Sequence, residues 1–505
     1  MELDYEDTSV GAGIAADADA DGGIEAVDAE LKADLAQRLA QAILNMNLYL
    51  MRAESRRLGD GDPTRVLAGA LCAEGRRLLA GALGAASPGR GACCVAPSTL
   101  RSAYRLIAAL ASLASWSAPA AQESCALGSF PLAAPRDVVS YARYGCAETA
   151  KQESVYATLL GFDQSRTRLL LTSSGMGAYA LIESFLLRDV LRPGDRAVLH
   201  PGVYFETQAQ LRSLACVEST TAAGARREDL LAAIVAREPR VVFVDPLTNT
   251  VELRLLDLNG VLNEADRVCR RETWFVIDGT LLSGAFDPFQ EPPRRHVRVL
   301  YYESGCKYLQ FGLDLGPAGV VVVERGLAER FEQLRRGLGA IAPEFLVLPR
   351  ASRRAYLQFL GRQTASAEAA ALAVSGRLPG RGTPCIEAVF PRIASHSDHR
   401  QTACYPHCGG LLTFRFSDQR LNRRGPLESF IDVVMHAARA AQLPLTTGVS
   451  FGFRIPRISA AWSDYNPGAA FLRLSAGVCP DRAAQLGVLI ARCASEFTAA
   501  APPCP

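Results

Sequence analysis

The chain has 505 residues, more than one compact domain ordinarily holds, so we expect two or three domains. It is 49% hydrophobic and 21% charged, as in globular enzymes, and its formal net charge of +2 argues against a nucleic-acid-binding surface. The 14 cysteines are scattered and the acidic N-terminus does not resemble a signal peptide, so we expect reduced thiols, a cytoplasmic location and no membrane-spanning segment.

The first part of the chain divides into an acidic tail and a helical region. Residues 1–28 are acidic and poor in large apolar side chains, so we expect them to be disordered. Residues 29–136 are expected to form helices followed by a linker. Their apolar side chains recur at helical spacing, at Leu31, Leu35, Leu39, Ile43 and Leu48. Solvated helix faces are expected at Arg76, Arg77, Arg101 and Arg105.

From residue 137 to about 344, short apolar runs alternate with helical segments. The expected strands are RLLLTSS, RAVLHP, RVVFVDP, TWFVIDG and RVLYYES. This alternation predicts an α/β domain with a mostly parallel sheet and helices on both faces. Ligands of such sheets bind at the carboxyl ends of the strands, so the residues that follow each run are candidates for a site.

These strand-end residues carry a consistent set of chemical groups. Gly175 and Met176 open a helix after the first run, and free backbone N–H groups at a helix start favour a phosphate. The later runs are followed by Tyr204, Asn249, Asp278 and then Lys307, with Ser304 three residues before the lysine. Each group alone has a simpler explanation, such as a turn glycine, a helix cap or an exposed lysine. Their occurrence at successive strand ends favours one shared site.

The set fits pyridoxal 5'-phosphate (PLP), a cofactor that needs an amine, a carboxylate, phosphate donors and a stacking aromatic ring. Lys307 can supply the Schiff-base amine, Asp278 the partner of the pyridinium nitrogen and Tyr204 the stacking ring. We therefore expect these three residues to be catalytic. An amine desolvated beside a cationic ring has a lowered pKa and can act as a base.

The motifs resemble those of the cystathionine γ-synthase family, the Cys/Met-metabolism group of fold-type-I PLP enzymes. The resemblance covers about residues 137–495. It rests on Tyr141 and Arg143 of YARYGCAETAKQE and on the motifs SGMGA, YFET, DGT, SGCKY, VSFGF and LRLSAG. It implies a seven-stranded cofactor domain at 137–344 and a smaller α/β C-terminal domain at 345–505.

The resemblance also implies roles for individual residues. Gly175, Met176 and Ser304 would bind the phosphate, and Ser450 and Arg473 would hold the substrate carboxylate. The cofactor site would further include Asn249, Thr280 and Cys306. Tyr141 and Arg143 would reach the active site of a neighbouring subunit, so we expect a homodimer or homotetramer.

The implied reaction is γ-replacement on a Cγ-activated amino acid such as S-adenosylmethionine or an O-acyl homoserine, through a vinylglycine-type quinonoid. A second small molecule would be the nucleophile. Departures from the family pattern bear on the substrate: CAE stands where the family has N-P-T, Cys306 where it has threonine and Gly279 where it has asparagine, and the family's G-H-S-D stretch lacks its His and Ser here. With the long N-terminal region, they resemble family members recruited to natural-product assembly. A β- or γ-lyase of sulfur amino acids and a non-catalytic PLP-binding scaffold remain alternatives.

Two other motifs in the sequence suggest different kinds of site, a hydrolase active site and a metal site, but each lacks residues that such a site needs. The run GVSFG matches a hydrolase nucleophile elbow, but such an enzyme needs a histidine after Ser450 and the last histidine is His436. The run CYPHC has no second ligand pair nearby, so we expect no metal site.

Overall fold

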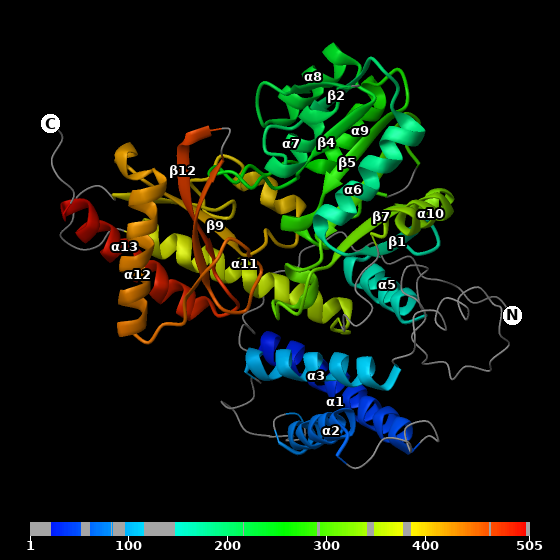
Figure 1. The fold of residues 1–505 in the computed structure, drawn as a ribbon. Helices are drawn as coiled ribbons and strands as arrows, with labels where there is room; N and C mark the ends of the chain where they lie inside the picture. Colours follow the sequence, from blue (N-terminus) through cyan, green and yellow to red (C-terminus); the bar gives the residue numbers. More distant parts are fainter. Residues whose placement is uncertain are drawn as a thin grey trace, which may run out of the picture.

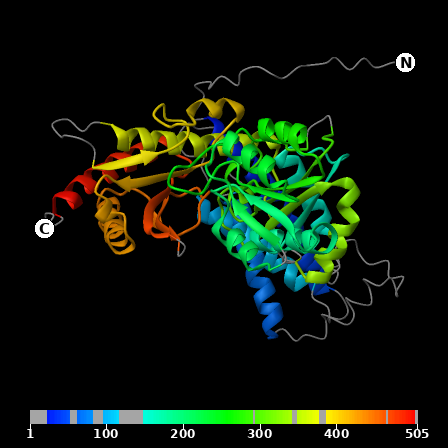
Figure 2. The same ribbon diagram turned by 90° about the horizontal axis from the view of Figure 1, so that it is seen from above.

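The computed structural model describes residues 22–51, 61–81, 83, 96–115, 147–215, 217–289, 293–340, 348–376, 385–463 and 466–500. Three helices at the N-terminal end lie beneath two α/β domains, which stand side by side (Figures 1 and 2). Tyr141 and Arg143, expected to reach a neighbouring subunit, lie outside the described residues. Among those residues, none of the helices combines the length and apolarity that a bilayer span requires.

The N-terminal helices are α1 (Gly22–Met51), α2 (Pro63–Ala80) and α3 (Pro97–Ser115). The expected apolar stripe of α1 is buried from Leu31 to Ile43, but Leu48 is 51% exposed and Met46 is buried instead. The expected disorder up to residue 28 is wrong for residues 22–28. Val27 lies one helical turn before Leu31 and is fully buried, so it extends the stripe and the helix begins earlier.

The large domain is built on a seven-stranded sheet with the order β1-β7-β6-β5-β4-β2-β3. All five expected runs form strands, and β3 and β7 are additional. β7 is antiparallel to both of its neighbours, and the other pairs are parallel, which confirms the mostly parallel fold class. The strands are β1 (Thr167–Thr172), β2 (Asp195–Leu199), β3 (Val217–Thr221), β4 (Val241–Val244), β5 (Thr273–Asp278), β6 (Val297–Ser304) and β7 (Gly319–Glu324).

Helices cover both faces of this sheet because successive strand side chains point to opposite sides. On β5, Trp274 and Val276 join the apolar cluster beneath α6, whereas Phe275 and Ile277 join the cluster beneath α8 and α9. Ser174 begins α6 by accepting a hydrogen bond from the Gly177 amide, 2.9 Å away. The helices are α5 (Ala147–Leu160), α6 (Gly175–Phe185), α7 (Phe205–Ser213), α8 (Arg227–Arg237), α9 (Leu258–Val268) and α10 (Ala328–Leu338).

The small domain has a five-stranded sheet with the order β10-β11-β12-β9-β8. Its long helix α11 (Arg353–Ser375) packs against both α13 and the N-terminal helix α1, so it joins two parts of the molecule (Figure 1). The remaining elements are β8 (Ile386–Val389), β9 (Leu411–Phe416), α12 (Arg424–Ala440), β10 (Thr446–Thr447), β11 (Arg457–Ser463), β12 (Asn466–Ser475) and α13 (Pro480–Ala500).

Candidate active site

Lys307 lies at the carboxyl edge of the large sheet, just after β6. Its Nζ donates a hydrogen bond to Ser450 Oγ of the small domain and lies 5.1 Å from the centroid of the Phe451 ring. Burial lowers the pKa of the Lys307 amine; nearby Cys306 opposes this shift, and the Arg473 cation adds to it. The amine therefore loses its proton at a lower pH than an exposed lysine does, and its neutral form can act as a nucleophile or base.

Asp278 ends the neighbouring strand β5, opposite Tyr302 of β6. Its Oδ1 accepts a hydrogen bond from the Thr280 amide at 2.9 Å, and Thr280 Oγ1 accepts one from the Ser304 amide at 3.0 Å. Burial raises the pKa of Asp278, while hydrogen bonds from Thr280 and Tyr302 and the Lys307 charge lower it part of the way. A cationic group at this carboxylate would favour its charged form.

Asp245, just after β4, is a buried carboxyl group that was not among the residues predicted for the site. It is 6% exposed and accepts a hydrogen bond from the backbone amide of Tyr204. Burial and then the Asp278 charge raise the pKa of Asp245. The sequence could have indicated Asp245, because this residue comes at the end of a predicted strand just as Asp278 does.

Tyr204 precedes α7 and contacts the Phe205 ring, with the two centroids 4.8 Å apart. Burial, followed by the charge and hydrogen bond of Glu206, raises the pKa of Tyr204 to about 12. Arg473 and Asp278 also act on this phenol, which places Tyr204 near both sides of the site. The phenol remains protonated at neutral pH and can donate a hydrogen bond or a proton.

The start of α6 and the end of β6 lie close together at the expected phosphate position. A Cβ atom on Gly175 would lie 2.9 Å from Ser304 Cβ, so only glycine fits there. The first backbone amides of a helix have no hydrogen-bond acceptor within the helix. The Ser174 side chain accepts a hydrogen bond from only one of them, the Gly177 amide. Ser304 Oγ lies 3.1 Å from Cys306 Sγ, so the cysteine contacts this hydroxyl group. Met176 lies beside Gly175 in the first turn of α6.

Arg473 of β12 brings the substrate side of the site together. Its Nη1 donates to Asn249 Oδ1 at 3.2 Å, and its Nη2 donates to the carbonyl oxygen of Val449 at 3.0 Å. Burial lowers the pKa of Arg473, and its buried Nε has no partner among the described residues. A guanidinium group so placed, with Ser450 next to Val449, has unused capacity for a carboxylate.

A buried network accounts for Gly279, one of the departures from the family pattern. A Cβ atom on Gly279 would lie 2.1 Å from the Tyr301 hydroxyl oxygen, so the phenol fills the space of a side chain. Tyr301 donates to Glu303 Oε2 at 2.5 Å, and Ser283 donates to Glu303 Oε1 at 2.8 Å. Burial raises the pKa of Glu303 to about 8, against these two hydrogen bonds.

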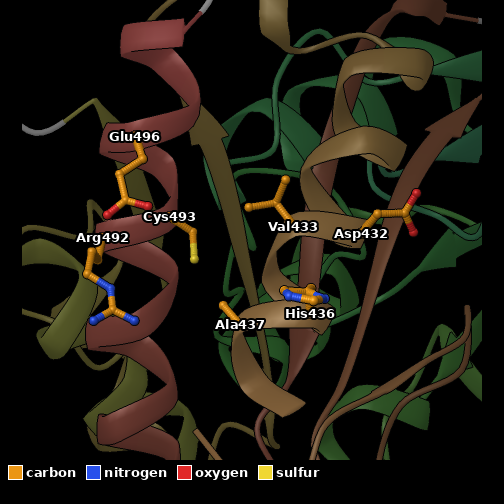
Figure 3. Close-up of a pocket in the computed structure, with 7 residues that line it drawn as sticks. All are labelled: Asp432, Val433, His436, Ala437, Arg492, Cys493 and Glu496. Atoms are coloured by element: carbon orange, nitrogen blue, oxygen red, sulfur yellow. The ribbon is translucent and has the colours of Figure 1, made fainter. Parts of the chain in front are cut away.

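An open groove of about 600 Å³ lies elsewhere, between α12 and α13. Figure 3 shows His436 and Asp432 on one wall and Arg492 and Glu496 on the other. Both helices belong to the small domain, and α12 lies on its side away from the large sheet (Figure 1). None of the residues expected at the site lines this groove, so the groove is separate from the Lys307 site.

The side chains around Lys307 fit a bound PLP. The desolvated amine could form the Schiff base, and Asp278 could supply the buried carboxylate for the pyridinium nitrogen. The free amides at the start of α6 and the Ser304 hydroxyl suit a phosphate. Among the described residues, the structure thus places those expected on the large domain, from Gly175 to Lys307, near Ser450 and Arg473 of the small domain.

Comparisons with known proteins agree with this geometry at the level of the fold. No family model matches the chain. The bifunctional enzyme flvA of Aspergillus flavus is 31% identical over 351 residues, which are 67% of this chain and 41% of that protein. The chain therefore spans less than half the length of this relative.

Two crystal structures of cystathionine γ-synthase from Xanthomonas oryzae pv. oryzae have the same architecture. The complex with aminoacrylate and cysteine has a TM-score of 0.55 and 22% identity, covering 72% of this chain and 89% of that one. The complex with cystathionine has the same TM-score and identity, covering 71% and 88%. The chain therefore has the fold of cystathionine γ-synthase, fold type I of the PLP-dependent enzymes, which confirms the predicted resemblance at the level of the fold.

Proposed function

We propose that this protein is a PLP-dependent enzyme that catalyses γ-replacement on a Cγ-activated amino acid, in the biosynthesis of a natural product. S-adenosylmethionine and O-acyl homoserines are the candidate donors, and a second small molecule is the nucleophile. The chain would act as a cytoplasmic homodimer or homotetramer, with Tyr141 and Arg143 reaching the neighbouring active site.

The observation that carries the proposal is the convergence of Lys307 and Arg473 from two domains. The lysine amine contacts Ser450, and the arginine contacts Val449, the residue next to it. An amine that can remove a proton and a guanidinium that can hold a carboxylate are both needed to act on an α-amino acid. A protein that only bound PLP would not need the second group.

The positions of the side chains support a role for each in the proposed reaction. Bound PLP would supply an electron sink for negative charge that develops at the substrate Cα. Lys307 Nζ, with its lowered pKa and its hydrogen bond to Ser450, would take the Cα proton, pass it on to the bound cofactor, and only then, as a neutral amine again, take a Cβ proton. Asp278 would keep the ring nitrogen protonated.

The remaining groups bind and orient the substrate. Arg473 would exchange its contacts with Asn249 and the Val449 carbonyl for the two oxygens of the substrate carboxylate. Tyr204, protonated because its pKa is raised to about 12, would donate a proton to the departing group. Asn249 would remain at the cofactor site.

The first experiment is to add PLP to the purified protein and to record its absorption spectrum. We expect the yellow band of lysine-bound PLP in the wild-type protein and not in Lys307→Ala. The matched control is Lys151→Ala, because Lys151 is an exposed lysine on α5. A wild-type protein with no such band would refute the cofactor assignment.

A panel of amino acids then tests the reaction. A rapid spectral change with S-adenosylmethionine, but not with O-acyl homoserines or cystathionine, would support specialised γ-replacement. The reverse pattern would point to ordinary sulfur-amino-acid metabolism. Equal inertness to all amino acids in a PLP-loaded protein would favour the non-catalytic scaffold.

A β- or γ-lyase is the second candidate. One structural neighbour is a complex with aminoacrylate and cysteine, and a site of this kind could release a group from Cβ. Release of a 2-oxo acid from the amino acid alone, with no added nucleophile, would favour this reaction over replacement.

A further inference from the structure

The N-terminal helices contact two chain segments next to the Lys307 site, one that follows Lys307 and one that follows Ser450. From α3, Arg101 Nε donates to the carbonyl oxygen of Leu313 at 2.6 Å, so Arg101 is not on the solvated face expected from the sequence. From α1, Asp28 forms an ion pair with Arg454. Leu313 lies shortly after Lys307 in the chain. Arg454 is the last residue of the segment Val449–Arg454, which contains Ser450.

The ion pair between Asp28 and Arg454 is enclosed by the protein. Its side chains are only 2% and 4% exposed, and Arg454 Nη1 lies 2.5 Å from Asp28 Oδ1. Arg454 Nε also donates to the carbonyl oxygen of Phe311 at 2.9 Å, and the Arg454 amide donates to that of Gly312 at 3.4 Å. Arg454 thus joins helix α1 to the turn that follows Lys307.

The segment Val449–Arg454 packs tightly against that turn. A Cβ atom on Gly452, whose φ is +85°, would lie 3.0 Å from the Tyr308 ring and 3.2 Å from the carbonyl carbon of Lys307. The same segment carries Ser450, which accepts the hydrogen bond from Lys307 Nζ. A shift of Arg454 would therefore move a direct partner of the amine.

We propose that Asp28 is a positioning residue for the Lys307 site: through Arg454, it holds the segment that carries Ser450 against the turn after Lys307. The inference deepens the proposed function and rests on it for the expected effect on turnover. A buried ion pair often contributes no more stability than apolar residues of similar volume, but removing one partner leaves a buried charge. The pair thus serves alignment of its neighbours rather than net stability.

The test compares Asp28→Asn with Asp34→Asn. Asp34 lies further along α1 and accepts hydrogen bonds from the Tyr104 hydroxyl and the Arg350 amide, so it docks the same helix without contacting Arg454. The first readout uses cofactor-free protein: the rate and pH dependence of Lys307 modification by an amine reagent, followed by peptide mass spectrometry. Of the other two lysines of the chain, Lys151 on α5 is the internal reference, because Lys32 lies one helical turn from Asp28 on α1.

We expect Asp28→Asn to change the rate of Lys307 modification by about tenfold, and Asp34→Asn to leave it near the wild-type value. In the PLP-loaded enzyme, Asp28→Asn should lower kcat by about ten- to a hundredfold with little change in KM, because a small misplacement has effects of this size. Unchanged Lys307 reactivity in Asp28→Asn, or equal changes in both variants, would overturn the proposal.

Failure of the proposed function gives a different result. If the wild-type protein does not bind PLP, the modification rate of Lys307 still decides the role of Asp28. Should Asp28→Asn not fold, the double variant Asp28→Leu with Arg454→Met replaces the pair by apolar residues. We expect this variant to unfold near the wild-type temperature with altered Lys307 reactivity, and wild-type reactivity in it would overturn the proposal.

Discussion

The two sides of the candidate site are held in different ways. On the cofactor side, Asp278, Thr280 and Ser304 lie at adjacent strand ends and are joined by hydrogen bonds within one sheet. On the substrate side, Arg473 comes from the small domain and contacts Asn249 of the large domain. One side depends on a single sheet, whereas the other depends on how separate parts of the chain dock.

This difference indicates where the chemistry can change. A sheet edge keeps its spacing when distant parts of the protein vary, so the cofactor groups stay in place. The groups proposed to bind the substrate depend on the contact between the domains, and the N-terminal helices reach that contact through Arg101 and Asp28. If the proposed function holds, substrate choice can therefore diverge while the proposed cofactor site persists.

The largest effect is expected on the cofactor side, from Asp278→Asn. An amide cannot supply the negative charge that keeps a ring nitrogen protonated, so we expect kcat to fall by about 10²–10³-fold, as when one electrostatic stabiliser is removed. Lysine-bound PLP should still be visible in the absorption spectrum. Asp245→Asn is the control, because Asp245 holds the Tyr204 backbone and should have a smaller effect. Near-normal turnover in Asp278→Asn would contradict the assigned role.

A smaller and different effect is expected on the substrate side, from Arg473→Lys. Lysine lacks the planar fork that binds both oxygens of a carboxylate, so kcat/KM should fall by about ten- to a hundredfold, mainly through KM. The absorbance of bound PLP should not change. Arg415→Lys is the control, because Arg415 lies on the adjacent strand β9 and pairs with the exposed Glu387. If Arg473→Lys instead loses PLP, the two sides are not separate.

Glu303, buried behind the site, should make stability depend on pH. Its pKa in the folded protein is raised from 4.5 to about 8, so the folded state binds more protons than the unfolded state between these values. The free energy of unfolding should therefore fall as pH rises through this window, by roughly 1.4 kcal/mol per pH unit from this group. Denaturant unfolding at several pH values should show a flatter profile in Glu303→Gln. An identical profile in both proteins would exclude Glu303 as its source.

A local effect on stability, with no direct effect on the proposed chemistry, is expected at Gly279, where the chain departs from the family pattern. Gly279→Ala would force a methyl group against the Tyr301 phenol and should lower the free energy of unfolding by about 1–3 kcal/mol. Gly361→Ala is the control, because a Cβ atom there meets nothing within 4 Å and glycine weakens a helix interior. It should stabilise the protein slightly. A neutral Gly279→Ala would show that Tyr301 moves aside readily.

Strand ends were predictable from the residues because short apolar runs that alternate with helical segments are a local pattern. The runs before Gly175, Asp278 and Lys307 became β1, β5 and β6, and parallel strands place their carboxyl ends at one edge. The same rule would have found Asp245. It could not place Arg473 beside Asn249, since that contact joins two domains.

Local pattern therefore determined the large sheet and the order of the chemical groups at its strand ends, and it singled out Lys307 as the amine among them. Tertiary packing alone decided which groups surround that amine. Ser450 meets Lys307, Tyr301 fills the space beside Gly279, and Asp28 meets Arg454. These partners are far apart in the chain, and no periodicity of side chains encodes a contact between residues that only the packing of separate layers brings together.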